Sequence, residues 1–418
     1  MAAPDSRRSL LALLVLALVF TLGASAAKLY LQREHKPAWA NANHEYDGFF
    51  AIDFHAQKAE RIRDFMDGSQ PGFERLARDL GDDMHPTSVA PLALVAALGL
   101  LTGSISGSFI ALSAAAWLAL VAIAMALARR TADTLALARR RAADTGGLAR
   151  RTAADAGALA KRTAADAQTE SQHRGLFTPP ALVAGILVAG HLLSARTAGQ
   201  LYLDGFAALV AALVLLQLGP WRAAPTLRGS ALLVLTLTLG LFTKISCLPL
   251  LALPPLAVLV IRPATERRHL REFAGSVVVA LLPLVPWALA LSLMPKGDVL
   301  AESRDLLGAW SLDRGHLMHF GQEMVLLFQA APLLLFLRKP RATSTERLAL
   351  LTIAVLALAT WAFRLPPIAR LYLPLLVPLA VFAAARLTAR VEPRRLLLAL
   401  SAWWLANAAL TTWGLMQL

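Results

Sequence analysis

The chain has 418 residues, of which 57% are hydrophobic and only 16% are charged, and its mean hydropathy is +0.56. A soluble domain of this size does not need so much apolar surface, so the composition excludes an ordinary soluble protein. The net charge of +14 does not indicate a nucleic-acid partner. Lys and Arg cluster in short segments between apolar runs, as the positive-inside bias of membrane proteins predicts.

Apolar runs that are long enough to cross a bilayer recur from one end of the chain to the other. Runs of about 18 or more apolar residues with few charges are typical of transmembrane helices. We therefore predict an all-α fold, a polytopic transmembrane helix bundle of about 11 to 12 spans. The runs cover residues 9–27, 88–128, 176–194, 198–219, 227–243, 245–262, 272–294, 321–338, 346–363, 367–388 and 394–415. The single cysteine, Cys247, leaves no internal disulfide and no cysteine-based metal site.

Residues 1–128 are predicted to form N-terminal membrane helices with an acidic outer loop at 28–86. We expect the first run, residues 9–27, to be a retained helix. The alternative is a signal peptide, because Ala24-Ser25-Ala26 resembles a cleavage site. Either way the loop lies on the outer side. Within it, residues 54–80 mix apolar and charged residues at helix-like spacing, which predicts interfacial helices in this first outer loop.

Residues 129–174 form a basic insert with an 11-residue repeat. Leu-Ala-(Arg/Lys)-Arg recurs from Leu127, with Asp133 and its equivalents following in step, eleven residues apart. Eleven residues are just over three helical turns, so the basic pairs return to nearly the same face. Such a helix suits anionic lipid or a partner. We favour the plainer interpretation, a solvated low-complexity insert on the cytoplasmic side.

The remaining residues, 175–418, are predicted to form the main transmembrane bundle. Its basic segments at 266–271, 338–341 and 390–395 should be cytoplasmic. Counting spans backwards from these segments puts the repeat on the cytoplasmic side as well. Because the acidic loop is outside, residues 88–128 must then cross the membrane an odd number of times. Hydropathy, however, predicts two crossings there. Either one half of 88–128 is re-entrant, or the whole run is a single long broken span, or the repeat lies outside the cell. We favour the charge rule.

The acidic stretch at residues 43–53 is the most informative part of the outer loop. It contains Glu45 and Asp47, with Asp53 six residues further on, among aromatic rings and a glycine. Carboxylates beside a membrane surface and flanked by rings suit a sugar hydroxyl better than a lipid tail.

With this topology, several ionisable residues fall on the same outer plane as the acids. Polar groups beside a bilayer are costly, so together they indicate a functional site. They are His85, Arg196, Asp204, Lys244, Arg364 and Arg370. The chemistry that fits is glycosyl transfer from a lipid-phosphate donor. Cations would stabilise the phosphate leaving group, and one carboxylate would act as general base on an acceptor hydroxyl.

The order of short motifs along the chain resembles the glycosyltransferase C superfamily, whose multi-spanning members use polyprenyl- or dolichyl-phosphate sugars. Protein O-mannosyltransferases and lipid A aminoarabinose transferases belong to it. The motifs that carry the resemblance are Glu45-Tyr46-Asp47-Gly48-Phe49-Phe50, His85-Pro86-Thr87-Ser88, Ser194-Ala195-Arg196 with Asp204, Gly240-Leu241-Phe242-Thr243-Lys244, and Arg370-Leu371-Tyr372-Leu373-Pro374. Three of them depart from the family pattern: the second lacks a Pro, the third has an extra Ala, and the last has an inserted residue.

The resemblance implies a membrane glycosyltransferase acting on the extracytoplasmic face. Asp47 would be the catalytic base, with Glu45 beside it, and Lys244 and Arg370 would hold the lipid phosphate. His85, Arg196, Asp204 and Tyr372 complete the predicted substrate-binding set. The implied partners are a polyprenyl-phosphate sugar, membrane lipid and an acceptor glycan, lipid or protein, with no nucleic acid.

No cofactor is predicted. Some relatives bind a divalent metal through the loop acids, but the sequence has no second acidic cluster for a hard-cation site. We expect a multi-pass protein of the bacterial inner (plasma) membrane. Two other classes stay open. A transporter or lipid flippase would use ionisable groups such as Glu323 or His191. In a non-catalytic membrane scaffold the acidic loop would be only a linker.

Overall fold

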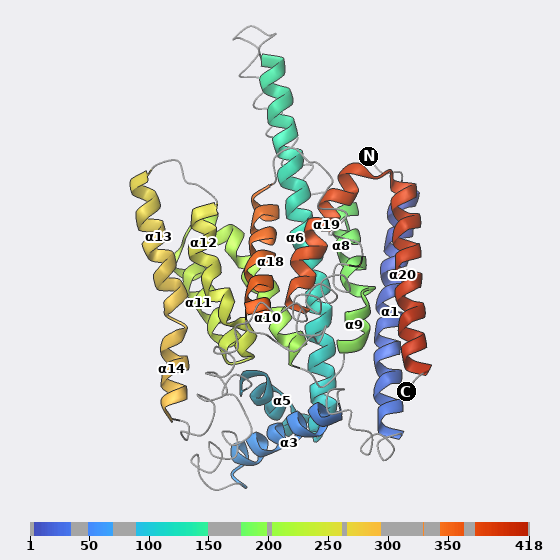
Figure 1. The fold of residues 1–418 in the computed structure, drawn as a ribbon, viewed down its shortest axis with the longest axis vertical. Helices are drawn as coiled ribbons and strands as arrows, with labels where there is room; N and C mark the ends of the chain where they lie inside the picture. The colour runs from blue at the N-terminus through green and yellow to red at the C-terminus, as the bar shows by residue number, and fades with distance from the viewer. Residues whose placement is uncertain are drawn as a thin grey trace.

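The computed structural model describes residues 4–34, 49–69, 89–148, 177–198, 203–260, 266–293, 329, 343–362 and 373–416. Within these ranges every regular element is a helix, which confirms the predicted all-α class (Figure 1). In chain order the helices are α1 (Pro4–Glu34), α3 (Phe49–Met66), α5 (Val89–Thr102), α6 (Ile105–Leu148), α8 (Pro179–Ala189), α9 (Leu192–Thr197), α10 (Asp204–Ala223), α11 (Leu227–Leu241), the 3₁₀ helix η2 (Ile245–Ala252), α12 (Leu253–Val260), α13 (Glu266–Leu281), α14 (Leu284–Leu293), α18 (Ser344–Ala362), α19 (Leu376–Arg390) and α20 (Pro393–Met416).

The described residues contain six helices that are long and apolar enough to cross a membrane. They are Ser6–Leu31, Ile105–Thr134, Asp204–Ala223, Leu270–Ala290, Leu373–Arg390 and Pro393–Met416. Four shorter apolar helices accompany them, at Val89–Thr102, Pro179–Ala189, Leu227–Leu241 and Ser246–Val260. The chain is therefore a multi-pass membrane protein. The expected total of 11 to 12 spans includes 321–338, which lies outside the described residues except for Gln329.

Helix α8 lies at the centre of the bundle, where α1, α6 and α19 pack against it. Almost every residue of α8 is buried, so its apolar surface faces protein on all sides. Gly185 permits the close approach of α6, because a Cβ there would lie 3.0 Å from the Met125 side chain. At the edges, most of the apolar stretches Leu270–Ala290 and Pro393–Met416 are not buried inside the protein, as expected for helices that face lipid.

The basic helix ends gather at one end of the bundle, which we call the cytoplasmic end on the positive-inside rule. The N-terminal end of α1, the α10–α11 turn, the start of α18 and the α19–α20 turn all lie there (Figure 1). The helix-end residues Arg222, Arg228, Arg390, Arg394 and Arg395 belong to this end. Helices α3 and α5 lie at the opposite, outer end.

Helix α5 does not cross the membrane, so the hydropathy-based expectation of two crossings in 88–128 is wrong. It lies beside α3 at the outer end of the bundle and does not extend to the cytoplasmic end (Figure 1). The Ala90 amide donates to the Phe242 carbonyl at the outer end of α11, 3.0 Å away. The chain then turns at Gly103, whose φ of +72° suits glycine. Only α6 crosses, which gives the odd number that the charge rule requires.

Helix α6 runs through residues 128 and 129 without a break, so the repeat begins as an extension of a transmembrane helix. Its distal part projects beyond the cytoplasmic end of the bundle (Figure 1). Arg129 and Asp133 pair at 3.7 Å across one helical turn. The 11-residue period repeats this spacing at Arg140 and Asp144. Such i,i+4 pairs stabilise exposed helices by a few tenths of a kcal/mol each.

Helices α8 and α9 form one broken helix, and α1 satisfies one carbonyl at the break and one at the C-terminal end of α9. The Thr21 hydroxyl donates to the Ala189 carbonyl at 2.7 Å, and the Ser25 hydroxyl donates to the Ala198 carbonyl. In a bilayer a carbonyl without a partner is costly, and broken helices persist where a neighbour supplies one. These two hydroxyls therefore fix α1 against the break.

Helix α18 starts with a buried capping box. The Thr343 amide donates to the Glu346 carboxylate at 2.8 Å, and the Glu346 amide donates back to the Thr343 hydroxyl at 3.2 Å. Glu346 is fully buried and lies 3.7 Å from the Arg386 guanidinium of α19. One carboxylate thus both starts α18 and joins it to α19 at the cytoplasmic end.

This topology predicts opposite labelling of the two ends. In a Cys247→Ser background, Ser69→Cys follows α3 at the outer end, and Arg394→Cys lies at the start of α20. A membrane-impermeant maleimide should label position 69 in intact cells and position 394 only after permeabilisation. The cysteine-free parent should remain unlabelled in both. Labelling of position 394 in intact cells would show that the assigned orientation is wrong.

Candidate functional site

The structure describes only part of the predicted site. Asp47, Glu45, His85, Arg370 and Tyr372 lie outside the described residues. The backbone of Arg196 belongs to α9, but its side chain also lies outside the described set. The remaining two predicted residues, Asp204 and Lys244, are described in full. The proposed general base and the proposed second phosphate ligand thus stay predictions.

Asp204 and Lys244 form an ion pair at the outer end of the bundle. Asp204 is the first residue of α10, where the positive end of the helix dipole favours a carboxylate. Lys244 follows α11 in an extended conformation and precedes η2. The Asp204 side chain is only 6% exposed, whereas that of Lys244 is 24% exposed. The structure therefore joins two residues that are 40 positions apart in the chain.

The Gly-Leu-x-Thr-Lys segment, residues 240–244, brings the lysine to this position. A Cβ on Gly240 would lie 2.8 Å from the Val210 side chain, so glycine allows α11 to approach α10 closely. The Thr243 hydroxyl donates to the Leu239 carbonyl at 2.6 Å and satisfies one carbonyl at the helix end. The Lys244 amide donates to the Gly240 carbonyl at 3.0 Å and closes the turn.

Helices α3 and α5 pack against the same corner. They share a buried apolar cluster with the start of α10, which contributes Leu203 and Phe206 on either side of Asp204. Phe206 also makes an edge-to-face contact with Phe109 of α6, with ring centroids 6.2 Å apart. Helix α3 begins two residues after Asp47, and α5 begins four residues after His85. Both helices that pack at this corner are therefore close in sequence to predicted site residues.

Lys58 of α3 is a buried cation that the sequence analysis missed. Its side chain is only 2% exposed, although α3 lies across the outer end of the bundle (Figure 1). The available signal was periodicity, because Lys58 precedes Ile62 by four residues and so lies on the apolar face of the helix. Met66, near the end of the same helix, is 49% exposed.

The ion pair with Asp204 keeps Lys244 from being an isolated charge when no ligand is bound, and it still leaves the lysine able to bind an anion. An ammonium group has three donors, and among the described residues only Asp204 accepts from it. The partly exposed amine therefore retains donors for a phosphate oxygen, while the buried carboxylate holds it in place. The positive charge is also partly offset, so a phosphate ligand would need further cations.

The described residues show no cluster of three or more His, Cys, Asp or Glu side chains that could hold a metal ion. His191 has a structural role instead. Its Nδ1 accepts from the Leu193 amide at 3.1 Å and caps α9, and its ring lies 6.3 Å from that of Trp403. A Cβ on the preceding Gly190 would lie 2.8 Å from Trp404, so the break in the helix is tightly packed.

In comparisons with known proteins, no family model and no curated protein sequence matches this chain. The arguments about function therefore depend on the residues and their geometry.

The buried pair predicts a non-additive mutant cycle. Lys244→Met should lower the free energy of unfolding by about 3 kcal/mol, because it leaves a buried carboxylate without its partner. Asp204→Leu should cost a similar amount. The double variant should recover most of the loss, because two apolar side chains replace the pair. Denaturant unfolding in detergent micelles measures all four proteins. If the double variant loses as much unfolding free energy as the two single variants together, the two side chains are not coupled.

Proposed function

We propose that this chain is a membrane glycosyltransferase that moves a sugar from a polyprenyl-phosphate donor to an acceptor on the extracytoplasmic face. The observation that carries the proposal is the part-buried Asp204–Lys244 pair, located at the outer end beside α3 and α5. A cation that is held at headgroup level, open on one side, suits a lipid phosphate. The acidic stretch at residues 43–53 would supply carboxylates for an acceptor hydroxyl.

In this mechanism the acceptor hydroxyl attacks the anomeric carbon of the donor sugar. Asp47 takes the hydroxyl proton as the general base, and Glu45 lies two residues before it. The bond from the anomeric carbon to the phosphate oxygen breaks, and its electron pair leaves with the lipid phosphate. Lys244 stabilises that charge, together with Arg370. The leaving phosphate needs no proton, so one carboxylate suffices, unlike in glycoside hydrolysis.

Asp204 acts in this scheme as a positioning residue, because it holds the Lys244 ammonium from the side facing the protein. His85, Arg196 and Tyr372 would contact the headgroup and the sugar. The displacement as written needs no cofactor.

A transporter is favoured by one observation, the discontinuous helix α8–α9, since transporters build substrate sites at such breaks. Here, however, the Val188 and Ala189 carbonyls at the break already accept from the Ser194 and Thr21 hydroxyls. Trp404 packs against Gly190 at the same place. A break that is filled by side chains has neither the space nor the open polar groups of a substrate site, so we prefer the enzyme.

The test is a transfer assay with a panel of radiolabelled polyprenyl-phosphate sugars and membranes that contain the full chain. Asp47→Asn should lower kcat by at least about 100-fold, because a general base contributes roughly 10² to 10⁴ in rate. Lys244→Ala should raise the KM for the lipid donor and lower kcat.

Asp64→Asn is the matched control, since Asp64 is an exposed acid on α3 that pairs only with the adjacent Arg63 in the described part of the chain. It should retain full activity. Full activity of Asp47→Asn in the same membranes would remove the proposed base. Transport of the labelled lipid without transfer would support a carrier instead.

A further inference from the structure

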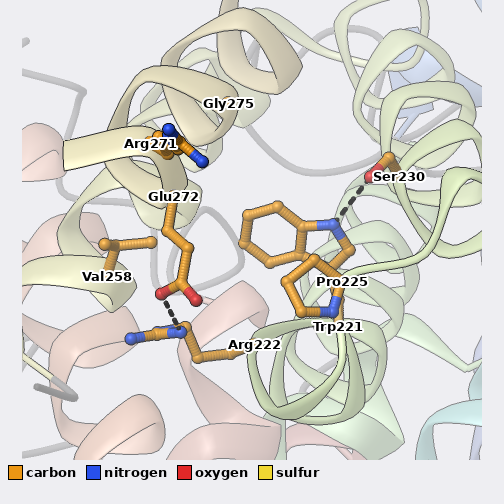
Figure 2. A pocket seen from close by; sticks show the side chains of 8 residues that line it. All are labelled: Trp221, Arg222, Pro225, Ser230, Val258, Arg271, Glu272 and Gly275. Carbon is orange, nitrogen blue, oxygen red and sulfur yellow. Dashed lines mark hydrogen bonds and ion pairs between the residues drawn. The ribbon is translucent and has the colours of Figure 1, made fainter. Parts of the chain in front are cut away.

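A second candidate site lies at the opposite, cytoplasmic end, between α10, α11, α12 and α13. It is a cavity of about 240 Å³ (Figure 2). Its walls include Trp221, Val258 and Gly275, and its charged groups are Arg222, Arg271 and Glu272. None of these residues belongs to the glycosyl-transfer site proposed above.

The charges in this cavity do not cancel. Arg222 and Glu272 pair at 2.7 Å and are only 8% and 12% exposed, so they neutralise one another. Arg271 is exposed at the rim, and no acid among the described residues pairs with it. The cavity therefore carries one net positive charge at the level where the helices leave the membrane.

The Trp221 side chain forms a fixed apolar wall. Its indole N–H donates to the Ser230 hydroxyl of α11 at 2.9 Å, which orients the ring across the cavity from Glu272 (Figure 2). Tryptophan is typical of membrane interfaces, where its ring contacts the region between headgroup and acyl chain. An apolar wall beside a single cation suits a ligand that has an anionic group and an apolar part.

The helices on both sides of the cavity expose apolar side chains to the bilayer. On α13, Leu270 and Val278 are 71% and 55% exposed, and on α11, Leu227 and Leu235 are 89% and 54% exposed. A ligand can therefore reach the cavity sideways from the lipid. At about 240 Å³ the cavity is smaller than the roughly 300–1,000 Å³ of small-molecule pockets, so it admits a headgroup while the acyl chains remain in the bilayer.

We propose that this cavity binds the phosphate headgroup of an anionic phospholipid of the cytoplasmic leaflet. Arg271 contacts the phosphate, Trp221 and Val258 contact the glycerol region, and the Arg222–Glu272 pair forms the floor. Basic pockets between transmembrane helices on this side of a membrane bind anionic headgroups by the same electrostatic attraction. The site is independent of the proposed transfer reaction.

The experiment titrates the full-length protein in detergent with dioleoyl phosphatidylglycerol or dioleoyl phosphatidylcholine and counts retained lipids by native mass spectrometry. Phosphatidylglycerol should bind more tightly. Arg271→Ala should weaken its binding about fivefold, the contribution of one basic side chain at an anionic surface. The matched control is Arg394→Ala, an exposed arginine at the same end on α20, which should leave this binding unchanged.

A second pair of variants tests the cavity without changing any charge. A Cβ on Gly275 meets no atom within 4 Å, so Gly275→Leu has room to fill the cavity and should also weaken phosphatidylglycerol binding. Gly414→Leu on α20 is the control, because its surroundings are equally open. Both changes replace a helical glycine, so helix propensity alone does not lower stability.

Three results would overturn the proposal. The first is equal affinity for the two lipids, which would mean that the headgroup charge is not recognised. The second is an Arg271→Ala protein that binds phosphatidylglycerol as tightly as Arg394→Ala does. The third is thermal stabilisation by inorganic phosphate that equals stabilisation by phosphatidylglycerol, which would make a soluble phosphate the ligand.

Discussion

Polar groups inside a bilayer need partners from the protein itself, and this constraint organises the fold. The Ala189 carbonyl at the α8–α9 break and the Ala198 carbonyl at the end of α9 accept from hydroxyls of α1. Asn407 of α20 and Gln329 exchange two amide hydrogen bonds, at 2.7 and 3.1 Å. In each case a polar contact links segments that are far apart in the chain. Apolar surface alone would not choose these partners, because lipid tails are as apolar as leucine.

The buried ion pairs follow the same constraint and mark the two ends of the bundle. Arg222–Glu272 and Arg386–Glu346 lie at the cytoplasmic end, and Asp204–Lys244 lies at the outer end. A charge pair in a poorly solvated place is costly unless its geometry is good and other groups support it. Glu346 has that support from its capping box, and Asp204 has it from the start of α10. The partly exposed Lys244 is the member that remains open to a ligand.

The two ends differ in their chemistry. At the outer end, α3 carries acids and cations close together in the chain, such as Asp64 beside Arg63. At the cytoplasmic end, arginines outnumber acids, and the long α6 continues away from the bundle (Figure 1). A transfer site outside and an anionic-lipid site inside would give the protein a fixed orientation and depth in the membrane. The outer site would then stay at the level of the donor headgroup.

Most of the fold class was predictable, and the failures have specific causes. The apolar runs predicted helices correctly, but they placed a crossing at α5, because hydropathy does not register that Ala90 is anchored to Phe242 at the outer end. Lys58 was missed because a lysine is normally an exposed residue. Of the candidate site, the outer-turn residues Asp204 and Lys244 were predicted, but their mutual pairing was not. The roles of Asp47, Glu45 and Arg370 stay predictions.

The sequence by itself determined that this is an all-α membrane protein and which end carries the positive charge. Both properties can be predicted from short segments of the sequence. A transmembrane helix makes all its backbone hydrogen bonds within one segment, and the bias of Lys and Arg toward the cytoplasm applies to each loop separately. Only the tertiary structure decided which buried charges meet and which apolar helix stays at the surface. Those outcomes depend on contacts between segments such as α10 and α11, where Gly240 lets two helices approach and Lys244 reach Asp204.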